Sequence, residues 1–124
     1  MLAERAEEYF ILPDAPRHYP ARFMLYVVDV VEQKREIIPA VTHVDGSARL
    51  QTVRAETTPR YYRLIERFGK ATGVPLLLNT SFNLKGEPIV NTPAEAYRTF
   101  VQSGMEVLVL GDCVIEKAGG TSGA

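Results

Sequence analysis

The sequence predicts an α/β fold in which helices pack on a twisted, mixed β-sheet of about five or six strands. Short apolar runs rich in β-branched and aromatic residues recur along the chain and are typical of strands. Two other segments repeat apolar residues at helical spacing behind a threonine, which predicts two helices. A length of 124 residues with 46% hydrophobic residues suits one small domain with a packed core.

The first half of the chain is predicted to hold a short helix and three strands. The apolar residues among the first ten repeat at helical spacing, and Pro13 and Pro16 end that pattern. The strands are residues 23–31, 37–44 and 48–53. The charged loop 32–36 joins the first two, and the turn signal Asp45-Gly46 predicts that the last two pair as a hairpin.

The second half is predicted to alternate helices with strands. Thr58 is a capping hydroxyl, Pro59 suits a first helical turn, and Gly73 suits a helix end. Residues 92–95 (TPAE) have the pattern of a capping box, which begins a second helix. The predicted elements are helix 58–72, strand 74–78, helix 92–103, and strands 107–110 and 113–115, the last two joined by Gly111-Asp112.

Composition and missing motifs exclude several function classes. The net charge of -1 gives no general attraction to nucleic acid or to an anionic membrane surface. The single cysteine, Cys113, excludes an internal disulfide and fits a cytoplasmic protein, and two histidines do not indicate a structural metal site. Charges from the fourth residue onward argue against a signal peptide or a membrane anchor. No GxxxxGK[ST], GxGxxG, HExxH or GxSxG motif occurs.

Small polar side chains follow the predicted strand 74–78, at a position where α/β folds bind ligands. They are Asn79, Thr80, Ser81 and Asn83. Their hydroxyl and amide groups can donate to phosphate oxygens and accept from amino groups, which suits a nucleotide or a small amide. Gly86 would let the backbone turn tightly against such a ligand. The alternative is that these side chains only cap the strand and form a turn.

A second candidate group lies in residues 42–49 (THVDGSAR). Arg49 is a permanent cation among apolar and small residues, which is costly unless an anion is near. His43 and Asp45 are two apart and would share a face of a regular strand, as a base and its orienting group would. No hydroxyl or thiol nucleophile is indicated beside them. The alternatives are a surface salt bridge for Arg49 and a satisfied hairpin for the other two.

Three stretches resemble the carboxy-terminal region of the nodulation-protein-U-type O-carbamoyltransferases. They are residues 39–53 (PAVTHVDGSARLQTV), 72–97 (TGVPLLLNTSFNLKGEPIVNTPAEAY) and 107–117 (VLVLGDCVIEK). In that family this region belongs to a YrdC-like, Sua5-type domain. The run 81–88 (SFNLKGEP) is similar to the SANxSGEP signature of YrdC proteins, whose serine and asparagine help to hold a nucleotide-linked carbamate or carbamoyl group.

The resemblance implies that residues 1–117 form a YrdC-like carboxy-terminal domain of a carbamoyltransferase, and the Gly/Ser-rich residues 118–124 are expected to be a disordered tail. It implies that ATP and carbamoyl phosphate are the substrates and that carbamoyl-adenylate forms from them. Carried onto matching positions, Arg49 contacts phosphate, Ser81 and Asn83 bind the ligand, and Asn79 shapes the pocket. The remaining candidates of the site are His43, Thr80 and Gly86.

The family also implies partners that these residues do not supply. Its members pass the carbamoyl group to a hydroxyl acceptor in a metal-binding, Kae1-like amino-terminal domain, and they carry a basic KxREPFRPFAP-like stretch upstream of this region. A metal ion is therefore expected only in that other domain. We expect the substrates and the Kae1-like domain as partners, no nucleic acid and no membrane, and self-association through an exposed apolar patch. The alternative function is a non-catalytic YrdC-like module that binds a nucleotide or serves in assembly.

Overall fold

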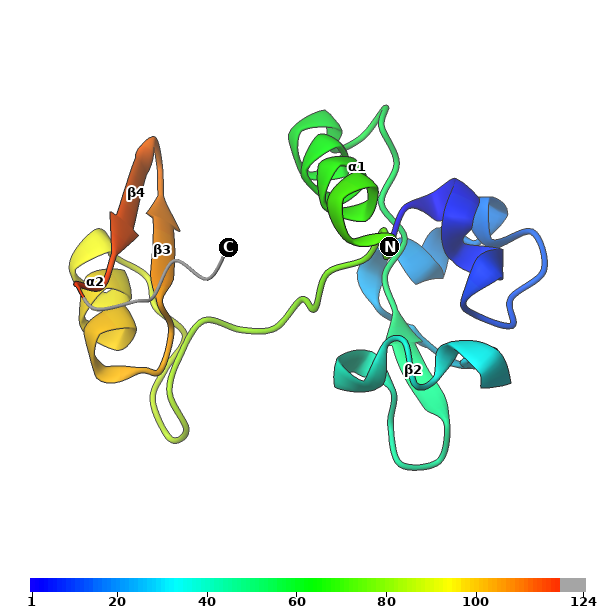
Figure 1. The fold of residues 1–124 in the computed structure, drawn as a ribbon, viewed down its shortest axis with the longest axis horizontal. Helices are drawn as coiled ribbons and strands as arrows, with labels where there is room; N and C mark the ends of the chain where they lie inside the picture. Colours follow the sequence, from blue (N-terminus) through cyan, green and yellow to red (C-terminus); the bar gives the residue numbers. More distant parts are fainter. Residues whose placement is uncertain (119–124) are drawn as a thin grey trace. The chain divides into compact units, whose positions relative to one another are not determined.

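The computed structural model describes residues 1–118 and divides into two compact units (Figure 1). The first unit is Met1–Leu78, and the second begins at Asn79. Of the tail predicted at 118–124, all but Ala118 lies outside the described residues.

The first unit contains a two-stranded antiparallel sheet, a row of short 3-10 helices and one α-helix. Its strands are β1 (Tyr26–Asp29) and β2 (Ser47–Leu50), and its α-helix is α1 (Pro59–Thr72). The 3-10 helices are η1 (Ala3–Glu8), η2 (Ala15–Arg17), η3 (Tyr19–Phe23), η4 (Glu32–Lys34) and η5 (Pro39–Val41). In the β1–β2 ladder Val27 lies opposite Arg49 and Val28 opposite Ala48. Because strand side chains alternate, one face carries Val27 and Arg49 while Ala48 faces the core.

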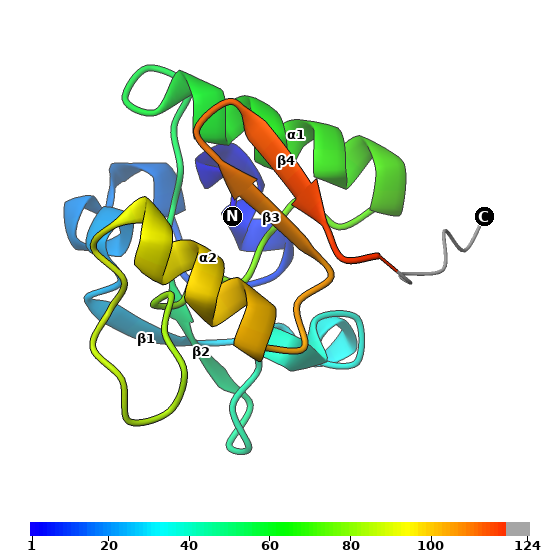
Figure 2. The same ribbon diagram turned by 90° about the vertical axis from the view of Figure 1, so that its left-hand side faces the viewer.

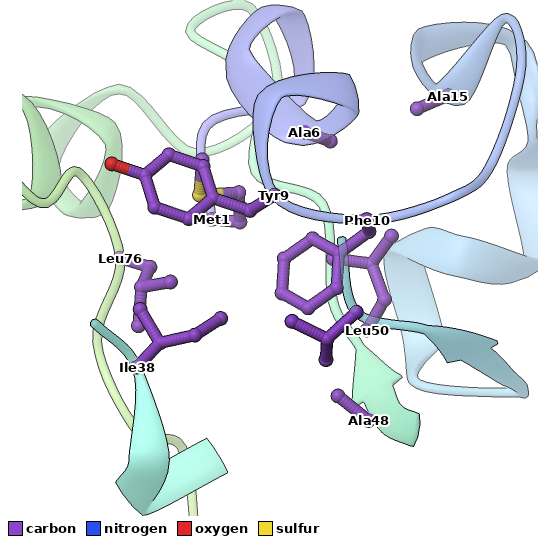
Figure 3. Close-up of a cluster of buried hydrophobic side chains, with 10 residues drawn as sticks. Met1, Ala6, Tyr9, Phe10, Ala15, Ile38, Ala48, Leu50 and Leu76 are labelled. Atoms are coloured by element: carbon purple, nitrogen blue, oxygen red, sulfur yellow. The ribbon is translucent and has the colours of Figure 1, made fainter. Parts of the chain in front are cut away.

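The main hydrophobic core of the first unit is drawn from distant parts of the sequence. Figure 3 shows side chains from the first ten residues, from β2 and from Leu76 gathered in one cluster. Its larger members include Tyr9, Phe10, Val30, Ile38, Leu50 and Leu76. The Tyr9 hydroxyl also donates to the Gly73 carbonyl at 3.3 Å, so the polar end of this ring is satisfied.

The helix α1 packs through a second, smaller cluster. Ile65 is fully buried with Leu2 and Val53, and residues 2 and 53 also form a parallel bridge. At the end of the helix, Gly73 has φ 81° and its N–H donates to the Gly69 carbonyl, as a C-terminal glycine should. The predicted capping role of Thr58 is wrong, because its hydroxyl bonds the Arg54 carbonyl instead of a helix N–H.

The second unit consists of a loop, one helix and a hairpin. The helix is α2 (Pro93–Gln102), and β3 (Val107–Leu110) pairs antiparallel with β4 (Cys113–Glu116). Figure 2 shows α2 and this hairpin, and α2 lies against β3. Phe100 and Leu108 are buried, whereas Val109 and its cross-strand partner Val114 are exposed.

The α/β class is confirmed, but its strands lie in two small antiparallel sheets and not in one mixed sheet. The predicted strand 37–44 contains the 3-10 helix η5, and β2 pairs with β1 instead. The predicted strand 74–78 forms no ladder, and within it the Leu76 N–H bonds the Val74 carbonyl. Both segments contain a proline, Pro39 or Pro75, which has no N–H to donate to a ladder.

Candidate functional site

The turn that precedes β2 is closed by backbone and side-chain hydrogen bonds. The His43 N–H donates to the Ser47 carbonyl at 2.7 Å, and the Gly46 N–H donates to the His43 carbonyl at 2.9 Å. Gly46 has φ 84°, in the left-handed region, and a Cβ on residue 46 would lie 2.5 Å from the guanidinium carbon of Arg35. The turn therefore has little freedom to change shape.

Asp45 and His43 both bond Ser47. Asp45 Oδ1 accepts from the Ser47 hydroxyl at 2.7 Å and from the Ser47 N–H at 2.9 Å. These bonds hold the pKa of Asp45 below its ordinary value, the hydroxyl contributing most. His43 Nδ1 lies 2.9 Å from Ser47 Oγ. The structure thus places the Ser47 hydroxyl beside His43 and Asp45, which the sequence analysis did not indicate. The Asp-Gly-Ser sequence is the signal that could have predicted the contact of Asp45 with Ser47, because Asp side chains in turns bond the backbone two residues on.

Arg49 follows this turn on the exposed face of β2. It lies opposite Val27, which is 63% exposed, and on the same face as Ser47. Among residues 1–118 the Arg49 side chain has no ion pair or hydrogen bond, so the surface salt bridge considered for it is not formed. Its guanidinium remains able to bind an anion with two parallel hydrogen bonds.

The second candidate group lies in the loop that leads to α2. Asn79, Thr80 and Ser81 are exposed, whereas Asn83 is half-buried. The Asn83 amide donates to the carbonyls of Leu84 and Glu87, at 3.2 and 3.0 Å.

A tight turn follows Asn83 in this loop. The Glu87 N–H donates to the Leu84 carbonyl at 3.0 Å, and Gly86 takes φ 87° at the third position of that turn. Gly86 therefore makes the turn that its sequence predicts. The Asn83 amide N–H groups stabilise the same turn, so these hydrogen bonds have a structural role.

A pocket of about 170 Å³ lies between the end of this loop and α2. Glu87, Val90 and Arg98 line it, together with Glu95, whose carboxylate accepts from the N–H groups of residues 91 and 92. These bonds lower the pKa of Glu95. Arg98 was not expected in a site, and its only signal was its position one helical turn after Glu95.

The candidate residues are divided between the two units. Arg49 and His43 belong to the first unit, and Asn79, Ser81 and Asn83 belong to the second. The resemblance predicts that Arg49, Asn79, Ser81 and Asn83 converge on one cleft, and this stays a prediction.

Among residues 1–118, no group of three or more His, Cys, Asp and Glu side chains is placed to hold a metal ion. No helix in this part of the chain combines the length and the apolar character needed to cross a membrane.

Comparison with known proteins gives one family for almost the whole chain. The family model described as "Carbamoyltransferase C-terminus" matches residues 1–117. The chain is 50% identical over 117 residues to nodulation protein NolNO of Sinorhizobium fredii (strain NBRC 101917 / NGR234), a match that covers 94% of this chain and 17% of that protein. It is 47% identical over 116 residues to nodulation protein NolO of Bradyrhizobium diazoefficiens, covering 94% of this chain and 21% of the relative.

A protein named as an O-carbamoyltransferase is also similar. The chain is 40% identical over 98 residues to a 3'-hydroxymethylcephem-O-carbamoyltransferase of Amycolatopsis lactamdurans, a match that covers 79% of this chain and 18% of that enzyme. The chain thus spans about a fifth of the length of these curated relatives.

Proposed function

The chain belongs to the family of carbamoyltransferase C-terminal regions, and from this premise we propose that it is the nucleotide-handling part of an O-carbamoyltransferase. In this proposal it binds ATP and carbamoyl phosphate, and the carbamoyl-adenylate made from them supplies the carbamoyl group. The acceptor is a hydroxyl group held by another part of the enzyme. The relative from Amycolatopsis carries O-carbamoyltransferase in its name, which supports a hydroxyl acceptor.

Arg49 is the observation on which the proposal depends. ATP and carbamoyl phosphate are both phosphate anions, so a protein with a net charge of -1 must bind them with local cations. Arg49 is exposed and has no carboxylate partner in the described part of the chain. A guanidinium matches phosphate geometry and stays charged at all relevant pH values.

The loop that begins at Asn79 supplies the neutral groups that the proposal needs. Ser81 presents a hydroxyl in an exposed stretch, and Asn83 uses its amide N–H groups on the turn. The Asn83 Oδ1 atom can then accept a hydrogen bond from the ligand. These residues match the serine and asparagine of the YrdC signature.

Calorimetric titration of ATP and of carbamoyl phosphate tests the proposal. We expect weak binding to this chain, with a Kd on the order of millimolar. Arg49→Ala should weaken binding by about tenfold or more, because a charge-assisted hydrogen bond contributes about 1.5 to 3 kcal/mol. Arg63→Ala is the matched control, since Arg63 is also exposed and is not a candidate. It should bind as the parent does.

A longer protein makes the test decisive. The same titration in a version extended upstream, with the residues that precede this region in its relatives, should give tighter binding. The proposal is wrong if the extended protein binds neither ligand, or if Arg49→Ala binds as well as the parent. A non-catalytic module would then replace it.

A further inference from the structure

The hydrogen bonds around Ser47 determine where its single hydroxyl proton lies. Ser47 Oγ is 2.7 Å from Asp45 Oδ1 and 2.9 Å from His43 Nδ1. An ionised carboxylate can only accept, so the Ser47 hydroxyl donates to Asp45. The lowered pKa of Asp45 agrees with an ionised carboxylate in this position.

With its proton committed to Asp45, Ser47 Oγ can only accept from His43. We infer that Asp45 and Ser47 are positioning residues that hold the neutral imidazole of His43 with its proton on Nδ1, so that Nε2 accepts a hydrogen bond from a ligand N–H or O–H. The His43 side chain is exposed, and of its two ring nitrogens only Nδ1 has a hydrogen-bond partner in the described part of the chain.

The surroundings of Ser47 fix this arrangement. Ser47 is only 7% exposed, so water does not compete freely for its hydroxyl. Its N–H also donates to Asp45, and its carbonyl accepts from the His43 N–H, so the three residues are tied by backbone as well as by side chains. The imidazole can therefore present Nε2 in one direction at little further entropic cost.

The ligand donor follows from the position of Arg49, and this step depends on the proposed function. Ser47 and Arg49 lie on the same face of β2, so the His43 acceptor and the Arg49 cation belong to one surface. Carbamoyl phosphate carries a phosphate that suits Arg49 and an amino group that suits His43 Nε2. His43 would thus select the carbamoyl group and Arg49 the phosphate.

The tautomer of His43 can be measured directly by imidazole ¹⁵N NMR at a pH where the ring is neutral. The second histidine, His18, is an internal reference, because its Nε2 lies 2.9 Å from the Pro13 carbonyl and must donate to it. We expect opposite tautomers, Nδ1–H for His43 and Nε2–H for His18. The inference is overturned if both rings carry their proton on Nε2.

A matched pair of variants tests the role of Asp45 without touching His43. Asp45→Asn keeps an acceptor oxygen and should keep the Nδ1–H tautomer. Asp45→Ala frees the Ser47 hydroxyl to donate to Nδ1, and His43 should shift to the Nε2–H tautomer. An unchanged His18 signal shows that the first unit is folded. If Asp45→Ala leaves the His43 tautomer unchanged in a folded protein, Asp45 is not a positioning residue.

Ligand choice is tested by comparing carbamoyl phosphate with acetyl phosphate, which has a methyl in place of the amino group. We expect the parent to prefer carbamoyl phosphate by about threefold to tenfold, as one hydrogen bond gives. The His43→Ala protein should lose this preference, whereas Arg49→Ala should weaken the binding of both ligands equally. A preference that survives in His43→Ala refutes the ligand assignment alone. If neither the parent nor the upstream-extended protein binds either phosphate, the proposed function and the ligand assignment both fail, and the tautomer measurement still decides the positioning role.

Discussion

Gly69 and Pro75 approach so closely that a Cβ on residue 69 would lie 2.7 Å from the Pro75 Cβ and 2.8 Å from its Cα. Replacing a helical glycine by alanine normally stabilises a helix by about 1 kcal/mol. Here Gly69→Ala should instead destabilise the first unit by about 1 to 3 kcal/mol, because the clash includes the backbone of Pro75. Urea unfolding of the two proteins measures the difference.

Lys70→Ala is the control for this substitution. Lys70 is the next residue of α1, it is exposed, and its ion pair with Glu66 at 3.2 Å is a surface pair of little value. Its free energy of unfolding should stay within about 0.5 kcal/mol of the parent. A Gly69→Ala protein as stable as Lys70→Ala would show that α1 and Pro75 are not packed this closely.

Gly46→Ala should destabilise the turn before β2. Gly46 has φ 84°, and a Cβ there would lie 2.5 Å from the guanidinium carbon of Arg35. The left-handed backbone alone costs an alanine about 1 to 2 kcal/mol. The Arg35 side chain is flexible and can move, so Arg35→Ala should recover only a small part of the loss. Urea unfolding of the two single variants and the double variant separates the two contributions, and full recovery would contradict the backbone explanation.

The elements predicted correctly are those whose signals are local. Gly73 ends α1, the pattern of residues 92–95 forms the capping box of α2, and Gly111-Asp112 joins β3 to β4. Each depends on residues within one or two turns of chain. The choice of β1 as the partner of β2 depends on packing between distant segments, which hydrophobic periodicity does not encode.

The candidate residues could be chosen from the sequence, but their hydrogen bonds could not. Arg49 stands out in the sequence because a cation is costly among apolar residues, and its side chain has no ion pair or hydrogen bond in the described part of the chain. The contact of Ser47 with His43 depends on the shape of a four-residue turn, and the apolar run 37–44 suggested a strand there instead. A side-chain contact made within a turn is specified only once the backbone of that turn is known.

The capping box of α2 should stabilise the start of its helix more than the threonine before α1 stabilises the start of α1. The Thr92 hydroxyl accepts from the Glu95 N–H at 3.3 Å, and Glu95 Oε2 accepts from the Thr92 N–H at 2.9 Å. Thr92→Ala should therefore speed hydrogen exchange of the amides at the start of α2, by an amount that corresponds to a loss of about 1 kcal/mol in helix stability. Thr58→Ala is the control, because Thr58 makes no capping bond and should cost less than about 0.5 kcal/mol. Equal effects of the two substitutions would contradict this assignment.

Protonation of Asp45 should loosen the turn only in acid. Its folded pKa is depressed, chiefly by the Ser47 hydroxyl and then by the Ser47 N–H. The stabilisation is therefore complete above the unfolded pKa, about 3.9, and is lost as the pH falls through the lower folded value. The Ser47 amide signal in NMR should stay constant from about pH 7 to pH 5 and shift only below about pH 4.

Ser47→Ala serves as the control for that titration. Without the hydroxyl, the largest cause of the shift is gone, so the Asp45 carboxyl should titrate closer to its ordinary pKa. The side-chain ¹³C signal of Asp45 reports this directly. A parent protein whose Asp45 titrates above its ordinary value would show that the carboxylate is not held by these bonds.

Ser81→Ala and Asn83→Ala should separate ligand binding from loop structure. Asn83 donates to the carbonyls of Leu84 and Glu87, so Asn83→Ala should loosen that turn and speed exchange of the Glu87 amide.

Ser81 is exposed and has no hydrogen bond among the described residues, so Ser81→Ala should leave the free energy of unfolding within about 0.5 kcal/mol of the parent. If Ser81 contacts the nucleotide-linked carbamoyl group, Ser81→Ala should weaken ATP binding by about twofold to tenfold. This effect is smaller than the one expected for Arg49→Ala, because a neutral hydrogen bond is weaker than a charge-assisted one. Thr57→Ala removes another exposed hydroxyl and should leave binding unchanged. Ser81→Ala is informative because its predicted effect is on affinity alone, so a loss of stability or an unchanged affinity would assign the SFNLKGEP loop a purely structural role.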